Sequence, residues 1–303
     1  MNRRHFLQAI AACLGLAQLD RLAASVHADP LLKVIPSSGE KLPAIGMGSF
    51  VSFNVGHDVE VLQQRTELLR IFFQLGGGII DSSPMYGSSE RNLGYCLENL
   101  KYVDGLFSAT KVWTTSVEDG AAEIQASRNL WKVDQFDLLQ VHNLLSWQGH
   151  LETLFEMKQL GRLRYVGVTT SHGRRHAELE KIMLTQPIDF VQATYNAIDR
   201  EVEQRILPIA RERGIAFIAN RPFQRGSLVD WAKKHPLPGF AREFECDNWA
   251  SLLLKFIVSH PAVTCAIPAT TRLDHLFENM SAMRGIVPEQ KMRETLVKYI
   301  AAL

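Results

Sequence analysis

Residues 107–142 read FSATKVWTTSVEDGAAEIQASRNLWKVDQFDLLQVH, and they contain the repeating unit that decides the fold class. This stretch predicts a buried strand at 107–112, a helix at 117–131 and a second strand at 137–141. The sequence on both sides continues the alternation, so that we count eight strands, each followed by a helix. Strands that alternate with helices form parallel sheets. Eight units in about 270 residues fit a closed α/β barrel of the (β/α)8 or TIM type, and an open doubly wound sheet is the alternative.

The expected elements follow one another from residue 31 onward. The predicted strands cover 44–48, 79–80, 107–112, 137–141, 165–168, 190–193, 216–219 and 264–268. The predicted helices cover 58–75, 88–100, 117–131, 147–160, 176–184, 200–213, 247–259, 273–283 and 289–301. A short hairpin with a Ser-Gly turn is expected at 31–41, ahead of the barrel. An irregular stretch at 224–245 is expected to shape one wall of a pocket.

The composition bounds the class of protein. The 303 residues are 46% hydrophobic and 21% charged, which is typical of a soluble globular protein. This length is enough for a single large domain. The net charge of +1 gives no reason to expect nucleic acid or an anionic membrane surface as a partner. No predicted strand runs into a G-x-G-x-x-G turn, which argues against a Rossmann cofactor site.

The N-terminal segment differs from the rest of the chain. Arg3 and Arg4 precede an apolar run at 9–19, and Val26-His27-Ala28 places small residues at the two positions that determine cleavage. This pattern is typical of a secretory signal, and the paired arginines are typical of the twin-arginine route for folded proteins. The apolar run is too short for a membrane anchor. We therefore expect a signal peptide at 1–28, a barrel at 29–303, the twin-arginine export machinery as a partner and a periplasmic location.

Two other interpretations of this segment stay open. It is either an ordinary amphipathic helix, or a lipoprotein signal processed at Cys13, because Ile10-Ala11-Ala12-Cys13 loosely fits a lipobox. Removal of the signal leaves Cys96, Cys246 and Cys265, an odd number without metal-ligand spacing. A disulfide scaffold is therefore not expected, and folding before export would explain its absence.

Four ionisable residues lie at or just after the ends of three successive predicted strands: Asp81, Tyr86, Lys111 and His142. An ionisable side chain at the end of a buried strand costs free energy unless it is paired. Strand ends in a barrel meet at its C-terminal mouth, where the chemistry of these folds takes place. We therefore expect one polar site that donates a proton to a carbonyl. Taken singly, each residue has a structural explanation, such as a turn cap for Asp81 or a solvated strand end for Lys111.

The sequence resembles the aldo-keto reductase family in five stretches that occur in order between residues 31 and 283. The most specific is Ile80-Asp81-Ser82-Ser83-Pro84-Met85-Tyr86-Gly87-Ser88-Ser89-Glu90, which matches the signature D-x-x-x-x-Y-G-x-x-E. The other four are SATK at 108–111, LLQVH at 138–142, GRLRYVGV at 161–168, and IPAT at 267–270 with Glu278-Asn279 after it.

The resemblance implies a (β/α)8 barrel that reduces a small-molecule aldehyde or ketone with NADPH and without a metal. It makes Tyr86 the proton donor, Lys111 and Asp81 the residues that tune it, and His142 the residue that orients the carbonyl. A free tyrosine has a pKa near 10, and a nearby ammonium lowers it. We therefore expect Lys111 to lower the pKa of Tyr86, and Asp81 to keep Lys111 charged.

The resemblance also implies contacts to the nicotinamide. Thr169, Thr170 and Gln192 stand where the family binds the carboxamide, although the family usually has Ser-Asn at the first pair. Asn220, followed by Arg221 and Pro222, replaces an aromatic residue that stacks on the nicotinamide in the family's aromatic-Ser-Pro-Leu segment. This departure puts the stacking in doubt.

The other implied contacts reach the rest of the nucleotide. They are Arg225, Gly226 and Ser227 at the pyrophosphate, Thr270 and Arg272 at the 2′-phosphate, and Glu278 and Asn279 at the adenine. An arginine at the 2′-phosphate favours NADPH over NADH, because its fork suits phosphate.

Phe53, Trp113 and Trp147 follow strands and are expected to line an apolar substrate pocket. The rival hypothesis is a regulatory protein that keeps the nucleotide site of the same barrel but turns over slowly, because a fold does not guarantee activity. The complete set of four ionisable residues favours the enzyme, and the missing stacking aromatic favours the rival.

Overall fold

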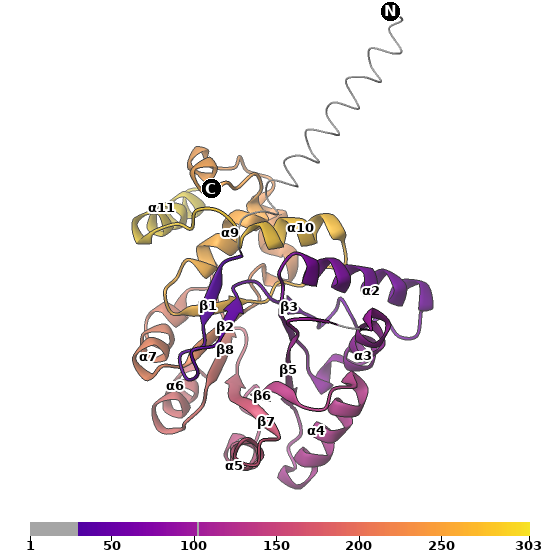
Figure 1. The fold of residues 1–303 in the computed structure, drawn as a ribbon. Helices are drawn as coiled ribbons and strands as arrows, with labels where there is room; N and C mark the ends of the chain where they lie inside the picture. Colours follow the sequence, from indigo (N-terminus) through magenta and orange to yellow (C-terminus); the bar gives the residue numbers. More distant parts are fainter. Residues whose placement is uncertain (1–29, 102) are drawn as a thin grey trace, which may run out of the picture.

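The computed structural model describes residues 30–101 and 103–303, and the expected signal peptide at 1–28 lies outside them. Eight parallel strands lie side by side in chain order and confirm the predicted barrel (Figure 1). They are β3 (Met47–Gly48), β4 (Ile79–Asp81), β5 (Phe107–Val112), β6 (Phe136–His142), β7 (Leu163–Thr169), β8 (Phe190–Thr194), β9 (Ala216–Asn220) and β10 (Val263–Ala266).

The barrel closes where β3 meets β10. Ile45 forms a parallel bridge with Ala266. The Gly46 N–H donates to the Ala266 carbonyl at 2.8 Å, and the Gly48 N–H donates to the Pro268 carbonyl at 3.0 Å. These few bonds bring the first and last strands of the sheet together, so that their C-terminal ends face the same mouth.

Helices surround the strands, as Figure 1 shows. The helices that follow strands directly are α2 (Val59–Gln74), α3 (Ser89–Leu100), α4 (Val117–Trp131), α5 (Trp147–Gln159), α6 (His176–Thr185), α7 (Ile206–Arg213), α8 (Ser227–Ala232) and α10 (Leu273–Ser281). Helix α9 (Trp249–Val258) precedes β10, and α11 (Gln290–Ala301) ends the chain. The outward-facing side chains of the strands pack against these helices in one large hydrophobic core.

A second, smaller core fills the inside of the barrel, because successive residues of a strand point to opposite faces. Leu138, Tyr165 and Phe190 belong to it. The antiparallel hairpin of β1 (Leu32–Val34) and β2 (Lys41–Pro43) adds Ile35 and Leu42 to the same cluster. The predicted hairpin is therefore confirmed, and it closes the N-terminal end of the barrel.

Two predicted segments differ from the structure. The helix expected at 200–213 is split into a 3-10 turn at Glu201–Glu203 and α7. Pro208 is the third residue of α7. In the first turn its missing N–H would have no intrahelical partner, so a new helix that begins at Ile206 accommodates the proline, whereas one continuous helix from residue 200 would not. The stretch 224–245, expected to be irregular, contains α8 and a 3-10 helix at Gly239–Phe244.

The packing of α3 against α4 yields a stability prediction. A Cβ on Gly94 of α3 would lie 1.8 Å from the Leu130 carbonyl oxygen of α4. Although alanine normally stabilises a helix, we expect Gly94→Ala to lower the free energy of unfolding by about 1–3 kcal/mol, because the two backbones must separate. Gly239→Ala is the control, since nothing lies within 4 Å of its Cβ, and it should change stability by less than roughly 0.5 kcal/mol. Equal urea midpoints for the two variants would contradict this account of the packing.

Candidate active site

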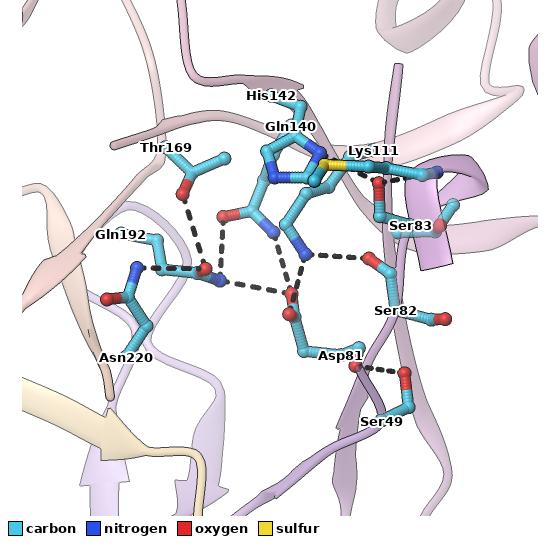
Figure 2. A network of polar contacts seen from close by, with 12 residues as sticks. Ser49, Asp81, Ser82, Ser83, Lys111, Gln140, His142, Thr169, Gln192 and Asn220 are labelled. Carbon is cyan, nitrogen blue, oxygen red and sulfur yellow. Dashed lines mark hydrogen bonds and ion pairs between the residues drawn. The ribbon is translucent and has the colours of Figure 1, made fainter. Parts of the chain in front are cut away.

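The inward-facing positions at the C-terminal ends of the strands form a polar layer above the apolar barrel interior. Asp81, Lys111, Gln140, Gln192 and Asn220 come from β4, β5, β6, β8 and β9, and all five are buried. Figure 2 shows their side chains pointing toward one another. Buried polar groups in proteins are almost always hydrogen-bonded. In this layer the five side chains provide hydrogen-bond partners for one another.

Lys111 and Asp81 form a buried ion pair at the centre of this layer. Lys111 Nζ lies 2.6 Å from Asp81 Oδ2, and the two side chains are 0% and 3% exposed. The same ammonium donates to the Ser82 carbonyl at 2.6 Å. Burial by itself lowers the pKa of Lys111, but the negative charge of Asp81 leads the opposing effects, and the pKa ends above its usual value. The lysine therefore stays charged at neutral pH, in agreement with the expectation.

The second oxygen of Asp81 accepts from two amides. Gln140 Nε2 and Gln192 Nε2 donate to Asp81 Oδ1 at 3.1 and 3.0 Å, and Gln192 Nε2 also lies 3.3 Å from Gln140 Oε1. Gln140 was not among the site residues expected from the sequence. It lies two residues before His142 on the same strand. Because side chains alternate between the two faces of a strand, both residues are predicted to face the inside of the barrel.

Tyr86 stands on a short 3-10 turn, Pro84–Tyr86, directly after β4. Ser83 Oγ caps the turn by accepting the Met85 N–H at 3.2 Å. The next residue, Gly87, has φ of 59°, and a Cβ there would lie 2.6 Å from Asn54 Oδ1. The motif therefore needs glycine after Tyr86 for a physical reason, since L side chains rarely adopt this backbone conformation.

Two opposing effects act on the pKa of Tyr86. Burial raises it, whereas the ammonium of Lys111, 5.3 Å from the ring centroid, lowers it. The net pKa lies above the usual value. Lys111 thus lowers the pKa of this phenol, as expected, but burial outweighs the ammonium, so the phenol is not more acidic than a free tyrosine. The phenol keeps its proton at neutral pH, as a proton donor requires.

His142 is held by Ser83, the same residue that caps the turn of Tyr86. Its Nδ1 lies 2.8 Å from Ser83 Oγ, and its ring meets that of Tyr86 edge to face with centroids 5.8 Å apart. Burial and the charge of Lys111 lower the pKa of His142 to about 3, so the imidazole is neutral. Because Ser83 occupies Nδ1, Nε2 is the nitrogen left for a ligand. Ser83 lies within the signature, but no role was expected for it from the sequence.

Glu90, the last residue of the signature, is a second buried carboxyl group. It accepts hydrogen bonds from Thr110 Oγ1 at 2.6 Å, Ser127 Oγ at 2.9 Å and Trp131 Nε1 at 3.1 Å. Burial raises its pKa above the usual range against these bonds. Glu90 therefore ties α3 to β5 and α4 behind the strand that carries Lys111.

A cleft of about 550 Å³ opens above the polar layer, at the C-terminal mouth. Asp81, Tyr86 and His142 line it, whereas Lys111 is fully buried. The expected cofactor residues that line it are Thr169, Gln192, Asn220, Arg221, Pro222, Arg225, Gly226, Thr270, Arg272, Glu278 and Asn279. Ser227 instead bonds the Gln224 carbonyl at the start of α8, and Thr170 is buried.

The floor of the cleft fits a carboxamide. Thr169 Oγ1 makes only long contacts, at 3.3 and 3.4 Å, and Thr170 Oγ1 is buried without a hydrogen-bond partner. Asn220 donates to the Thr170 carbonyl and accepts from Thr194 Oγ1, both at 2.8 Å. Asn220 is thus part of the polar layer, which agrees with the expected loss of the stacking ring at this position. Phe223, three residues later, lines the cleft with an aromatic ring.

At the outer end of the cleft, Arg272 is paired within its own loop. Its Nε donates to Asp274 Oδ1 at 2.9 Å, and a second nitrogen contacts the other carboxylate oxygen. A 2′-phosphate would have to compete with Asp274 for this fork. His275 lines the same end and was missed, although it follows Arg272 by three residues in the first turn of α10.

The expected substrate-pocket residues do not border the cleft. Phe53 is completely buried in the outer core, Trp113 is 42% exposed elsewhere, and Trp147 donates from Nε1 to Glu178 at 2.8 Å. The three side chains miss the cleft because a position after a strand places a residue near the C-terminal mouth but does not set the direction of its side chain. The apolar walls come from other residues, among them Phe50, Val51, Met85 and Phe223.

Three further findings concern residues 30–101 and 103–303 alone. No group of three or more His, Cys, Asp or Glu side chains there is placed to hold a metal ion. Cys96, Cys246 and Cys265 are buried free thiols. No helix in this part of the chain has both the length and the apolar character needed to cross a membrane.

The fold and the site together define a (β/α)8 barrel protein with a buried Lys111–Asp81 ion pair beside Tyr86 and His142, below a cleft at the C-terminal mouth. Residues 44–295 match the Aldo/keto reductase family. The chain therefore belongs to the aldo/keto reductase family, as the resemblance indicated.

Known proteins of this family resemble the chain at low identity. Aldo-keto reductase YhdN of Bacillus subtilis is 24% identical over 210 residues, which cover 64% of this chain. The match spans 62% of YhdN, less than two thirds of its length. The thermostable aldo-keto reductase Tm1743, solved with the inhibitor epalrestat, has a TM-score of 0.75 at 26% identity and covers 88% of this chain and 99% of its own. An aldo/keto reductase of Klebsiella pneumoniae, solved with NADP and acetate, has a TM-score of 0.73 at 21% identity, with 88% and 94% covered.

The buried ion pair leads to a double-variant prediction. Lys111→Met leaves the Asp81 carboxylate buried without its counter-charge and should lower the free energy of unfolding by about 3–5 kcal/mol. The double variant Asp81→Asn/Lys111→Met removes both charges and should be more stable than Lys111→Met alone, as measured by urea denaturation. Lys181→Met, at an exposed position of α6, is the control. A double variant no more stable than Lys111→Met would show that the unpaired charge is not the cause.

Proposed function

We propose that this protein is an oxidoreductase that reduces an aldehyde or ketone to an alcohol, with NADPH as the hydride donor. The observation that carries the proposal is the Lys111–Asp81 pair beside Tyr86 and His142, at the floor of a cleft of the size usual for cofactor and substrate sites. Membership of the aldo/keto reductase family supports it. The NADP complex of the Klebsiella pneumoniae relative supports the choice of cofactor.

The four side chains divide the work of proton transfer. Bound NADPH would supply a hydride to the carbonyl carbon. Negative charge then grows on the carbonyl oxygen, where Tyr86 and His142 offer hydrogen bonds that are already oriented. The proposed role of His142 requires the Ser83 hydroxyl to donate to Nδ1, so that the neutral imidazole carries its proton on Nε2 and donates it to the substrate oxygen. Tyr86 passes its proton to the oxygen, and the ammonium of Lys111 stabilises the phenolate left behind.

The chain's own residues fit the nucleotide from one end of the cleft to the other. The hydroxyls of Thr169 and Thr170 have the hydrogen-bonding capacity that a nicotinamide carboxamide needs. Arg272 offers a fork for the 2′-phosphate and so favours NADPH over NADH, once the phosphate displaces Asp274.

The proposed role of Tyr86 as proton donor can be tested by removing its phenolic oxygen. Tyr86→Phe should lower kcat for aldehydes by about 10²–10⁴-fold while NADPH still binds, because the ring and the cleft stay in place. The measurement is the loss of nicotinamide absorbance over a panel of aldehydes, with nucleotide affinity followed by fluorescence. Tyr95→Phe, on α3 and away from the cleft, is the matched control. Undiminished turnover by Tyr86→Phe would remove Tyr86 from the mechanism.

The second candidate function is a nucleotide-binding regulatory protein on the same barrel. The observation in its favour is Asn220, whose amide is bound into the polar layer where an aromatic ring would stack on the nicotinamide. Nucleotide binding without turnover of any carbonyl would favour this candidate over the reductase.

We also propose that the protein is exported folded by the twin-arginine route to the periplasm. The support is the order of Arg3-Arg4, the apolar run at 9–19 and Val26-His27-Ala28. The three buried thiols suit a chain that folds before it meets an oxidising compartment.

Export predicts a response to the paired arginines. Arg3→Lys/Arg4→Lys should hold the full chain in the cytoplasm of a bacterial host with the twin-arginine machinery, as cell fractionation would show. Arg21→Lys keeps the pair and should be exported normally. Periplasmic protein at undiminished yield from the double variant would rule out this route.

A further inference from the structure

The loops after β7 and β9 bring four basic side chains to the edge of the cleft. We call His172, Arg174, Arg221 and Arg225 the cationic rim, and three of them, His172, Arg221 and Arg225, line the cleft. Within the described chain, none of the three arginines is ion-paired with a carboxylate. Arg221 and Arg225 were expected among the nucleotide contacts, so the cofactor is one candidate source of the anion that they bind, whereas no partner was expected for Arg174 or His172.

The charges of the rim act on one another. Burial and the charge of Arg225 lower the pKa of Arg221. Loss of hydration and the neighbouring arginines lower the pKa of His172, which leaves it neutral at neutral pH. Asp199 opposes both shifts, but its carboxylate already accepts two amide hydrogen bonds at 2.8 Å. A concentration of like charge at a cleft attracts an anion.

The backbone of the rim is strained. His172, Arg221 and Arg225 have φ of 60°, 51° and 63°, and Gln224 has φ of 50°. Left-handed conformations cost free energy in residues other than glycine, and they gather at ligand sites. The loop after β7 therefore accepts strain at His172, and the loop after β9 accepts it at Arg221 and Arg225, which line the cleft.

The rim lies beside the proton donors. His142 and Thr169 are register partners at the ends of β6 and β7, so the loop with His172 starts next to His142. Arg221 directly follows Asn220 in the floor. The loop of Arg272, expected at the 2′-phosphate, instead follows β10, on the other side of β9.

Another stretch of the cleft edge is apolar. Phe50, Val51 and Met85 line it, and Val51 and Met85 are 67% and 39% exposed. The Phe50 ring connects this stretch to the cationic rim, because it lies 5.0 Å from the Tyr86 ring and 5.1 Å from the Arg225 guanidinium. A ligand that reaches Tyr86 thus meets apolar side chains on one stretch of the edge and cations on another.

We propose that the carbonyl substrate is amphiphilic, an aldehyde or ketone with an apolar body and an anionic carboxylate or phosphate group that Arg221 binds, with His172 and Arg225 beside it. This proposal rests on the reductase function proposed above. The cofactor diphosphate is a second source of the same anionic oxygens, so the test must separate substrate from cofactor.

The test compares two aldehydes of similar shape, 4-formylbenzoate and 4-methylbenzaldehyde, as ligands of the full chain saturated with NADP⁺. Calorimetry gives both dissociation constants without turnover, since NADP⁺ cannot reduce an aldehyde. The carboxylate should bind about tenfold or more tightly than the neutral aldehyde, the value of one charge-assisted hydrogen bond. Arg221→Gln should abolish this ratio, and Arg213→Gln, at an exposed position of α7, should preserve it.

The outcomes are distinguishable. Equal affinities, or no binding of 4-formylbenzoate, would overturn the proposal. An Arg221→Gln variant that loses NADP⁺ affinity but keeps the aldehyde ratio would overturn it as well, because the guanidinium then serves the cofactor. Oxidation of NADPH by 4-methylbenzaldehyde tests the reductase function separately, so a failure of that function does not decide the binding comparison.

Discussion

Two opposite charges buried inside the barrel, the ammonium of Lys111 and the carboxylate of Asp81, set the conditions that the rest of the site meets. A buried charge is costly unless it is paired and its remaining hydrogen-bonding capacity is used. The Ser82 carbonyl accepts a hydrogen bond from the Lys111 ammonium, and the Gln140 and Gln192 amides donate to the second carboxylate oxygen of Asp81. These partners come from the residue that follows β4 and from β6 and β8, so the ion pair depends on the closed arrangement of the strands.

The same pair determines how protons are distributed around it. Lys111 stays charged, and its charge together with burial keeps His142 neutral. Tyr86 keeps its proton because burial outweighs the ammonium. The described site therefore holds two neutral hydrogen-bond donors, the imidazole of His142 and the phenol of Tyr86, beside a cation. The proposed reduction uses this arrangement when negative charge grows on the substrate oxygen. Ser83 links the two donors by capping the turn of Tyr86 and binding His142.

The periodicity of the chain predicted most of the fold and the central part of the site. Alternating strands and helices located all eight barrel strands, and ionisable residues at strand ends located Asp81, Tyr86, Lys111 and His142. Gln140 was within reach of the same argument, because it shares the inner face of β6 with His142. The wrong expectations about the pocket lining concern residues that follow strands: Phe53 and Trp147, the first residue of α5, are buried in the outer core, whereas Phe50 lines the cleft.

The sequence by itself determined which residues end the strands and therefore which side chains face the barrel mouth, since strand geometry repeats every two residues and requires only local information. The tertiary structure alone decided the direction of the loop side chains, the balance of burial against charge at Tyr86, and the meeting of an apolar edge with a cationic rim. These depend on contacts between segments far apart in the chain, such as Phe50 with Arg225, and on how much water each group loses. Local sequence does not encode such distances.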